Sequence, residues 1–320
     1  MPTILLYLLH IILNFFYLFK ILQHFYFLCI YYIIMINFKV FKLNYKIILT
    51  FLISFIVFLL CFSCYHHSFA ETKAGIELPI IMYHSILKSQ SGTFIVHPNA
   101  LENDLQYIQS KGYTTIVMSD LINYVYNDAP LPEKPIIITL DDGYYNNLSY
   151  VVPLLHKYNM KAVISIVGKY SDDFTNSNIA NANYGYLRWK DINELILDGC
   201  IEFQNHTYNL HSLKNGRKGC AKIYNESLEN YTNLLSNDIN KLQLEFKNNC
   251  NYIPNTFTYP FGEVSRESYK IIKSLGFKAS LSCSSGINYI TKDPECLYLL
   301  KRNNRIGGIS TKEFFNTILN

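Results

Sequence analysis

The segment Ile136–Leu140 is a short apolar run that ends at two adjacent carboxylates, Asp141 and Asp142, followed by Gly143. Short runs rich in β-branched residues are typical of buried strands in a parallel sheet. Residues that follow such a strand lie at the carboxyl end of the sheet, where α/β folds place their ligands and catalytic groups. The segment therefore predicts an α/β fold with acidic side chains at the end of the sheet that carries chemistry.

A second apolar run, Ile201–Gln204, ends in a similar way at a loop that contains His206 and His211. One carboxylate and two imidazoles form a ligand set for a zinc-like divalent metal, with positions left open for water and substrate. The side chains of neighbouring strand residues point in opposite directions. Asp141 and Asp142 can therefore have different roles, one as a metal ligand and the other as a general base. Each motif alone also fits a polar turn or surface histidines, but their joint occurrence favours a metal site.

Strand-like and helix-like segments alternate from Leu78 onward, which predicts parallel strands with helices outside them. The predicted strands are Pro79–Tyr83, Ile136–Leu140, Ala162–Val167, Ile201–Gln204, Thr256–Tyr259, Phe277–Leu281 and Cys296–Leu300. The predicted helices are Pro98–Gln109, Ser149–Tyr158, Trp189–Leu197, Leu228–Phe246 and Ser265–Leu275. Seven strands favour a barrel over an open sheet, and no linker divides the region.

Residues 1–70 form a hydrophobic leader that differs from the rest of the chain. A basic stretch at residues 39–46 precedes an uncharged apolar tract at residues 47–61. Read from Met35, this order predicts an export signal that ends with a small-x-small cleavage motif at Ser68–Ala70. The alternatives are an uncleaved anchor, a pair of membrane spans, or translation that begins at Met35. Each interpretation places the remaining region outside the cytoplasm, either secreted or anchored at the outer face of the membrane.

Residues 71–320 are therefore expected to form one catalytic domain, since their number suits a single core of roughly 250 residues. The net charge of +4 comes without a basic patch interleaved with aromatics, which argues against nucleic acid as a partner. Five cysteines lie beyond the leader, an odd number without regular spacing. They predict core thiols, with one or two disulfides as the alternative.

The two polar motifs resemble those of the polysaccharide deacetylases, the NodB homology group or carbohydrate esterase family 4. Leu140–Gly143 is similar to the family's Thr-Phe-Asp-Asp-Gly motif, and His206–His211 to its His-Ser/Thr-x-x-His motif with one extra residue. That longer spacing resembles the branch that acts on poly-N-acetylglucosamine exopolysaccharides. Tyr259–Gly262 resembles the third motif, Arg-x-Pro-Tyr-Gly. The resemblance covers the chain from about Pro79 and implies a distorted (β/α) barrel.

The resemblance also implies a metal-dependent hydrolysis of N-acetyl groups on amino sugars. Asp142, His206 and His211 would hold one divalent metal, and Asp141 would act as general base. Zinc is the expected ion, with cobalt or nickel as alternatives that suit the same donors. By the same resemblance, the backbone N–H of Phe261 would stabilise the oxyanion.

Substrate contacts are expected from Tyr259 and Pro260 of the third motif. Trp189, the only tryptophan, could stack on a sugar ring, although a packing role at the start of its helix is the stronger interpretation.

The chain departs from the family's motifs in three ways, the first of which is the absence of the Asp-Trp pair of the fourth motif. The motif arginine that orients the base is missing before Tyr259, and Arg302 or Arg305 is expected to replace it. The closing Leu-His motif, which supplies the general acid, is also missing. His84, at the end of the first predicted strand, resembles an amino-terminal histidine of the exopolysaccharide branch and is expected to take this role. The alternative for His84 is a buried histidine bonded to a backbone carbonyl.

The resulting hypothesis is a deacetylase of N-acetylglucosamine-containing polysaccharide, in the cell wall or in an exopolysaccharide. A catalytically weak or inactive polysaccharide-binding domain of the same fold is the alternative, and the missing motif residues favour it slightly. A phosphoesterase is a second alternative, but it would usually need more metal ligands.

Overall fold

The structure is a computed structural model that describes residues 25–26, 49–59, 75–89 and 91–319. The chain forms two compact units, Met1–Glu71 and Thr72–Asn320. In the first unit residues 49–59 are helical. None of the described helices is both long enough and apolar enough to cross a membrane. Most of the predicted leader, including Met35 and the cleavage motif at residues 68–70, lies outside the described residues.

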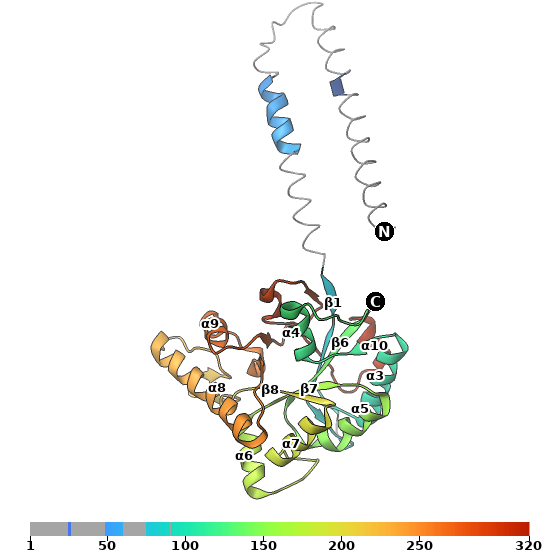
Figure 1. The fold of residues 1–320 in the computed structure, drawn as a ribbon, viewed down its shortest axis with the longest axis vertical. Helices are drawn as coiled ribbons and strands as arrows, with labels where there is room; N and C mark the ends of the chain where they lie inside the picture. Colours follow the sequence, from blue (N-terminus) through green and yellow to red (C-terminus); the bar gives the residue numbers. More distant parts are fainter. Residues whose placement is uncertain (1–24, 27–48, 60–74, 90, 320) are drawn as a thin grey trace, which may run out of the picture. The chain divides into compact units, whose positions relative to one another are not determined.

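A curled sheet of parallel strands forms the centre of the second unit (Figure 1). Its strand order is β12-β11-β8-β7-β6-β2-β14, and each neighbouring pair is parallel. The strands are β2 (Ile80–Tyr83), β6 (Pro135–Asp142), β7 (Ala162–Ile166), β8 (Ile201–Asn205), β11 (Thr256–Thr258), β12 (Ala279–Leu281) and β14 (Asn303–Asn304). A short strand, β5 (Thr114–Thr115), pairs with the start of β6. The prediction of a parallel α/β fold is confirmed.

The central strands are apolar throughout because both of their faces are covered. Every residue of β2, β6 and β7 is buried. Alternate residues enter two different core clusters, so that Ile138 of β6 packs in one cluster and Ile137 in the other. This two-sided burial explains why the sequence shows continuous apolar runs and not an alternating pattern.

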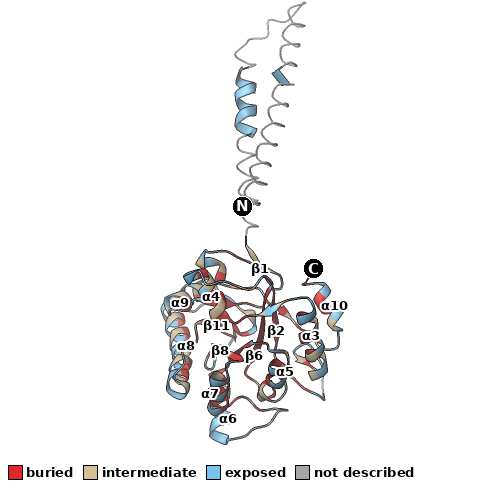
Figure 2. Cartoon of the chain, turned by 45° about the vertical axis from the view of Figure 1, so that its right-hand side comes forward, coloured by how far each residue is buried: buried red, intermediate tan, exposed pale blue. Residues whose placement is uncertain are grey.

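Helices surround the sheet and expose their outer faces, as Figure 2 shows. They are α3 (Pro98–Ser110), α4 (Met118–Asn127), α5 (Val152–Tyr158), α6 (Gly168–Ser177), α7 (Trp189–Asp198), α8 (Leu228–Cys250), α9 (Arg266–Ser274) and α10 (Thr311–Asn316). A π-helical turn, η1 (Asn147–Val151), precedes α5. The five predicted helices are present, and their bounds differ by a few residues. Helices α4, α6 and α10 were not predicted from the sequence.

The prediction of a last strand at Cys296–Leu300 is wrong. Pro294–Leu297 form a 3-10 turn, η3, and Leu299 adopts a left-handed backbone with φ 58° that interrupts an extended segment. Leu300 forms a parallel bridge to Leu281 of β12, and the chain then continues into β14 beside β2. Residues 300–304 therefore link the two outer strands of the curled sheet.

Several short strands also lie outside the predicted set. β1 (Ile76–Leu78) pairs with β13 (Asn288–Ile290), β3 (Ser85–Ile86) with β4 (Ile95–Val96), and β9 (Leu213–Lys214) with β10 (Arg217–Lys218). Runs of two or three residues are too short to give a periodic signal in the sequence.

The cysteines of the second unit are free, as the prediction of core thiols requires. All five are unpaired: Cys200, Cys220, Cys250, Cys283 and Cys296. Cys200 and Cys220 are buried, and burial raises the pKa of each thiol to about 12.

Candidate active site

The two polar motifs meet at the carboxyl end of the sheet. Asp142 is the last residue of β6, and His206 directly follows β8. In the strand register Asp142 lies opposite Ile166 of β7, which in turn lies opposite Asn205 of β8. Asp142 and the start of the histidine loop are thus two strands apart at the same level, roughly 10 Å in a parallel sheet. Side chains of this length can meet across that span.

Asp142, His206 and His211 bring three donor atoms together, all within 4.8 Å of one another. The Oδ1 atom of Asp142 lies 3.6 Å from Nε2 of His206 and 3.3 Å from Nε2 of His211. The same Oδ1 atom is buried and has no hydrogen-bond partner among the described residues. A buried carboxylate oxygen without a partner is costly unless a cation satisfies it. This donor group therefore fits a divalent metal.

His206 is prepared to bind a metal by its surroundings. Its Nδ1 atom lies 2.8 Å from the backbone oxygen of Thr258, which can only accept a hydrogen bond. Nδ1 must then carry the proton, so the neutral ring presents a free lone pair at Nε2. Burial, opposed in part by the charge of Asp141, lowers the pKa of His206 to about 4 and keeps the imidazole neutral.

The backbone after β6 turns sharply to present Asp142. Asp142 and Gly143 have φ values of 73° and 77°, in the left-handed region. A Cβ atom on Gly143 would lie 2.8 Å from Cγ2 of Ile166, so only glycine fits there. This turn separates the direction of Asp142 from that of Asp141, as the two-role hypothesis expects.

Asp141 lies against Arg302 in a fully buried ion pair. The guanidinium donates from Nη1 to Oδ1 at 2.7 Å and from Nη2 to Oδ2 at 2.8 Å. Burial alone would raise the pKa of Asp141, but the charge and the hydrogen bonds of Arg302 hold it well below its usual range. Asp141 is therefore ionised, and both of its oxygens have fixed directions.

Of the two arginines expected to replace the motif arginine, Arg302 contacts Asp141, whereas Arg305 does not. Nε of Arg302 donates to the backbone oxygen of Ser282 at 2.8 Å, which fixes the plane of the guanidinium. Arg305 is equally buried but pairs with Asp104 of α3, with Nε 2.7 Å from Oδ2. Of the two arginines considered from the sequence, only Arg302 contacts the site.

His84 follows β2, whose last residue, Tyr83, lies opposite Leu140 of β6, so His84 and Asp141 each come next along neighbouring strands. The Nδ1 atom of His84 is buried without a hydrogen-bond partner among the described residues, so this nitrogen gives no support to the alternative of a histidine bonded to a backbone carbonyl. The ring packs against Phe94 with centroids 4.7 Å apart. Burial lowers the pKa of His84, opposed by the charges of Asp141 and Asp142. The side-chain amide of Asn147 donates to the backbone oxygen of His84 at 3.0 Å and holds this segment.

Helix α8 positions the loop that carries His206 and His211 through Asp238, a residue that no sequence pattern had indicated. Both oxygens of Asp238 accept backbone N–H groups of the loop, from Tyr208 at 2.7 Å and from Asn209 at 2.8 Å. Asp238 lies on the polar side of an amphipathic pattern, where acidic residues are common. No local signal distinguishes it from the other acidic residues of α8.

The third motif reaches the site through Phe261. Phe261 has φ 56° in the turn η2 (Pro260–Gly262), and its ring lies 4.3 Å from that of His211. Tyr259, by contrast, is fully buried and packs against Phe257, and Pro260 is also buried. Their expected role in substrate binding is wrong for the side chains, because neither offers an exposed surface.

Trp189 is likewise a packing residue, so its role in sugar stacking is wrong. The residue is 5% exposed, and its ring packs edge-on against Phe246 and donates from Nε1 to Asp172 at 2.7 Å. This agrees with the stronger of the two interpretations from the sequence.

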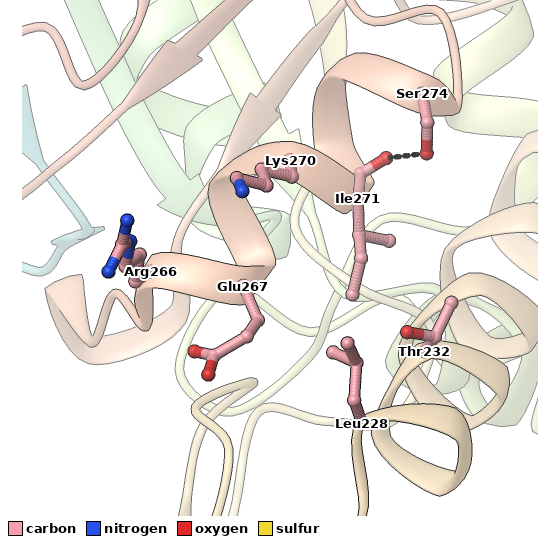
Figure 3. A pocket seen from close by; sticks show the side chains of 7 residues that line it. All are labelled: Leu228, Thr232, Arg266, Glu267, Lys270, Ile271 and Ser274. Atoms are coloured by element: carbon pink, nitrogen blue, oxygen red, sulfur yellow. Dashed lines mark hydrogen bonds between the residues drawn. The ribbon is translucent and has the colours of Figure 1, made fainter.

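Two other features could be mistaken for the site. A second donor group, His156, Asp198 and Cys200, lies at the opposite end of the strands, near the start of β8. A groove between α8 and α9 is visible in Figure 3 and shares no residue with the donor group of Asp142. Its lining is Leu228, Thr232, Arg266, Glu267, Lys270, Ile271 and Ser274.

Sequence comparisons agree with the geometry. The model of the family described as polysaccharide deacetylase matches residues 128–280. The poly-β-1,6-N-acetyl-D-glucosamine N-deacetylase of Escherichia coli is 23% identical over 243 residues, which cover 70% of this chain and 35% of that protein. The chain thus spans about a third of the length of this relative.

Solved structures share the fold. A de-N-acetylase from Aggregatibacter actinomycetemcomitans has a TM-score of 0.63 at 23% identity, covering 75% of this chain and 98% of that one. The Streptococcus pyogenes deacetylase PplD, in complex with acetate, has a TM-score of 0.60 at 19% identity. That similarity covers 76% of this chain and 99% of PplD, so the second unit corresponds to a whole structure of this fold.

Proposed function

This chain belongs to the polysaccharide deacetylase family, and we propose that it is a metal-dependent hydrolase of N-acetyl groups on a polysaccharide that contains N-acetylglucosamine. The observation that carries the proposal is the pairing of two neighbouring carboxylates with different surroundings. Asp142 faces two imidazoles with an unsatisfied oxygen, and Asp141 is ionised and held by Arg302.

Asp142, His206 and His211 would hold the metal, and zinc suits one carboxylate and two neutral imidazoles, with cobalt or nickel as alternatives. When bound there, a divalent cation would polarise the acetyl carbonyl and lower the pKa of a water molecule.

The residues of the chain then supply the proton transfers. Asp141 takes a proton from the water that attacks the acetyl carbon, and Arg302 keeps the accepting oxygens in place. The C–N bond breaks as the nitrogen gains a proton, which gives acetate and a free amine. We assign that proton to His84, whose imidazole must first take it up, since burial disfavours its charged form in the free protein. The backbone N–H of Phe261 would stabilise the oxyanion.

The proposed substrate is a polymer of β-1,6-linked N-acetylglucosamine. The support is the named activity of the Escherichia coli relative and the extra residue between His206 and His211. Location outside the cytoplasm, through the leader at residues 1–70, completes the proposal, because such polymers are exported. Attachment to the membrane would follow if the leader is not cleaved.

The alternative of an inactive polysaccharide-binding domain loses its main support. It rested on the missing motif arginine, and Arg302 makes the bidentate contact with Asp141 that such an arginine would make. An inactive domain would also have no need for an ionised Asp141 beside a complete donor group.

Acetate release from the purified protein tests the proposal. Poly-β-1,6-N-acetylglucosamine, peptidoglycan and chitin fragments should be compared, with and without added zinc. We expect zinc-dependent release that is greatest with the first polymer. Absence of acetate from all three, in protein shown to contain metal, would refute the proposed activity.

A further inference from the structure

Four aromatic side chains form a continuous surface next to the donor group. We call the set Tyr144, Tyr170, Phe174 and Tyr186 the aromatic wall. Tyr186 lies at its centre, with ring centroids 4.9 Å from Tyr144, 4.4 Å from Tyr170 and 5.4 Å from Phe174. The wall therefore combines the turn after β6, helix α6 and the loop before α7.

The aromatic wall is not part of the hydrophobic core. All four residues are half-buried, and none belongs to the three core clusters of the described chain. Aromatic residues in the core, such as Phe203 and Phe246, are by comparison fully buried. The rings of the wall contact one another and keep part of their surface open to solvent, which folding alone does not require.

Both sides of the wall reach the donor group. Tyr144 is two residues from Asp142, and a backbone bridge joins it to Tyr186. The hydroxyl of Tyr170 donates to the backbone oxygen of His211 at 3.4 Å. Two backbone hydrogen bonds hold the loop before α7 against the turn after β6. The N–H of Tyr145 donates to the oxygen of Gly185, and the N–H of Leu187 donates to the oxygen of Gly143, each at 2.8 Å. The wall is thus a rigid continuation of the proposed active site.

The chemistry of the wall suits neutral sugars. The charged side chains of α6 nearest to it are engaged elsewhere: Lys169 pairs with Asp173, and Asp172 accepts from Trp189 and Tyr208. What remains is flat apolar rings with phenol hydroxyls at their edges. A pyranose ring has the complementary pattern, an apolar C–H face and hydroxyls on its rim.

We propose that the aromatic wall binds the sugar units next to the one being deacetylated, so that the protein prefers a chain of several sugars to a short one. This inference rests on the proposed function for the identity of the sugar. Binding can nevertheless be measured without turnover, which separates the two proposals.

The test measures by calorimetry how tightly the protein binds a β-1,6-linked N-acetylglucosamine pentasaccharide and the corresponding disaccharide. All proteins in this test carry Asp141→Asn, which prevents turnover, and the protein with this substitution alone is the parent. Tyr186→Ala and Phe174→Ala should each weaken pentasaccharide binding by about 3- to 10-fold, as expected for loss of one stacking contact. Disaccharide binding should change by less than 2-fold. Tyr186→Trp keeps a stacking surface and should retain the affinity.

Tyr184→Ala is the matched control, because Tyr184 lies in the same loop, is 59% exposed and is outside the wall. The Tyr184→Ala protein should bind the pentasaccharide with the same affinity as the parent protein. Equal pentasaccharide affinity in the parent, Tyr186→Ala and Phe174→Ala, or absence of binding by the parent, would overturn the inference. If Tyr186→Ala fails to fold, Phe174→Ala decides. Length-dependent binding without acetate release by the wild-type protein would support the wall and refute only the proposed activity.

Discussion

At the scale of single residues, two adjacent aspartates have opposite surroundings, and this difference can be tested. Asp141→Asn should retain metal and lose turnover by about 10²–10⁴-fold, because an amide cannot take the proton from water. Asp142→Asn should instead lower metal content, since the substitution removes an anionic ligand. Elemental analysis and acetate release measure both variants. The reverse order of effects would exchange the two roles.

The proposed role of His84 as the proton donor can be tested by removing its imidazole. Its buried Nδ1 lacks a partner, so His84→Ala removes a polar atom that nothing in the described chain satisfies. We therefore expect little change in thermal stability and metal content, with turnover reduced by about 10²–10⁴-fold. His156→Ala, at an exposed histidine outside the site, is the control and should keep full activity. A large loss of stability with normal turnover would mark His84 as a packing residue.

At the scale of elements, α8 controls the geometry of the histidine loop through Asp238. In the wild type, the backbone N–H groups of Tyr208 and Asn209 each bond to a different oxygen of Asp238. Asp238→Asn has only one oxygen, so one of these two N–H groups loses its acceptor. The loop should loosen, and metal affinity should fall by about 10–100-fold, as is typical for residues that support ligands. A competition titration with a chelator measures this affinity. Asp173→Asn, on the neighbouring helix α6, is the matched control and should leave it unchanged.

The same carboxyl group predicts a pH dependence. Burial raises the pKa of Asp238 to about 6, opposed in part by the N–H groups of Asn209 and Tyr208. A raised pKa in the folded state means that the folded protein binds this proton more tightly than the unfolded chain. Its contribution to stability is then complete below about pH 4 and is lost as the pH rises through about 6. Urea unfolding of metal-free protein should show this loss in the wild type and not in Asp238→Asn. Parallel pH profiles of the two proteins would contradict the assignment.

The features that could be predicted from the sequence are those that a local residue pattern determines. The apolar run before Asp141 and the 3.6-residue period of α8 fix their elements without help from the rest of the chain. The contact between Arg302 and Asp141 spans 161 residues, and the sequence could only narrow it to two arginines. The roles of Asp238 and of the aromatic wall were not predicted, because each role depends on contacts with segments that are distant in the sequence. The last strand was misplaced because β14 has only two residues, both asparagine, and so shows no apolar run in the sequence.

At the scale of the whole molecule, the carboxyl-terminal segment supplies one arginine to the site and a second to the scaffold. Arg305 and Asp104 are both fully buried, and Asp104 also accepts from Tyr83 at 2.9 Å and from Thr311 at 2.6 Å. This cluster ties β2, α3 and the start of α10 together. Because neither residue touches the donor group, it should matter for stability and not for metal binding.

Arg305→Met should therefore lower the free energy of unfolding by about 3–5 kcal/mol, since it leaves the Asp104 carboxylate buried without its counter-charge. Adding Asp104→Asn should recover part of this loss, because the neutral amide needs no counter-charge and its single oxygen can still accept from either Tyr83 or Thr311. Chemical denaturation of the wild type, both single variants and the double variant measures this coupling, and metal content should be the same in all four. Arg302→Met is the matched comparison at the other buried arginine, and it should reduce turnover along with stability. If Arg305→Met abolished metal binding in protein that remains folded, the division between a catalytic and a scaffold arginine would be wrong.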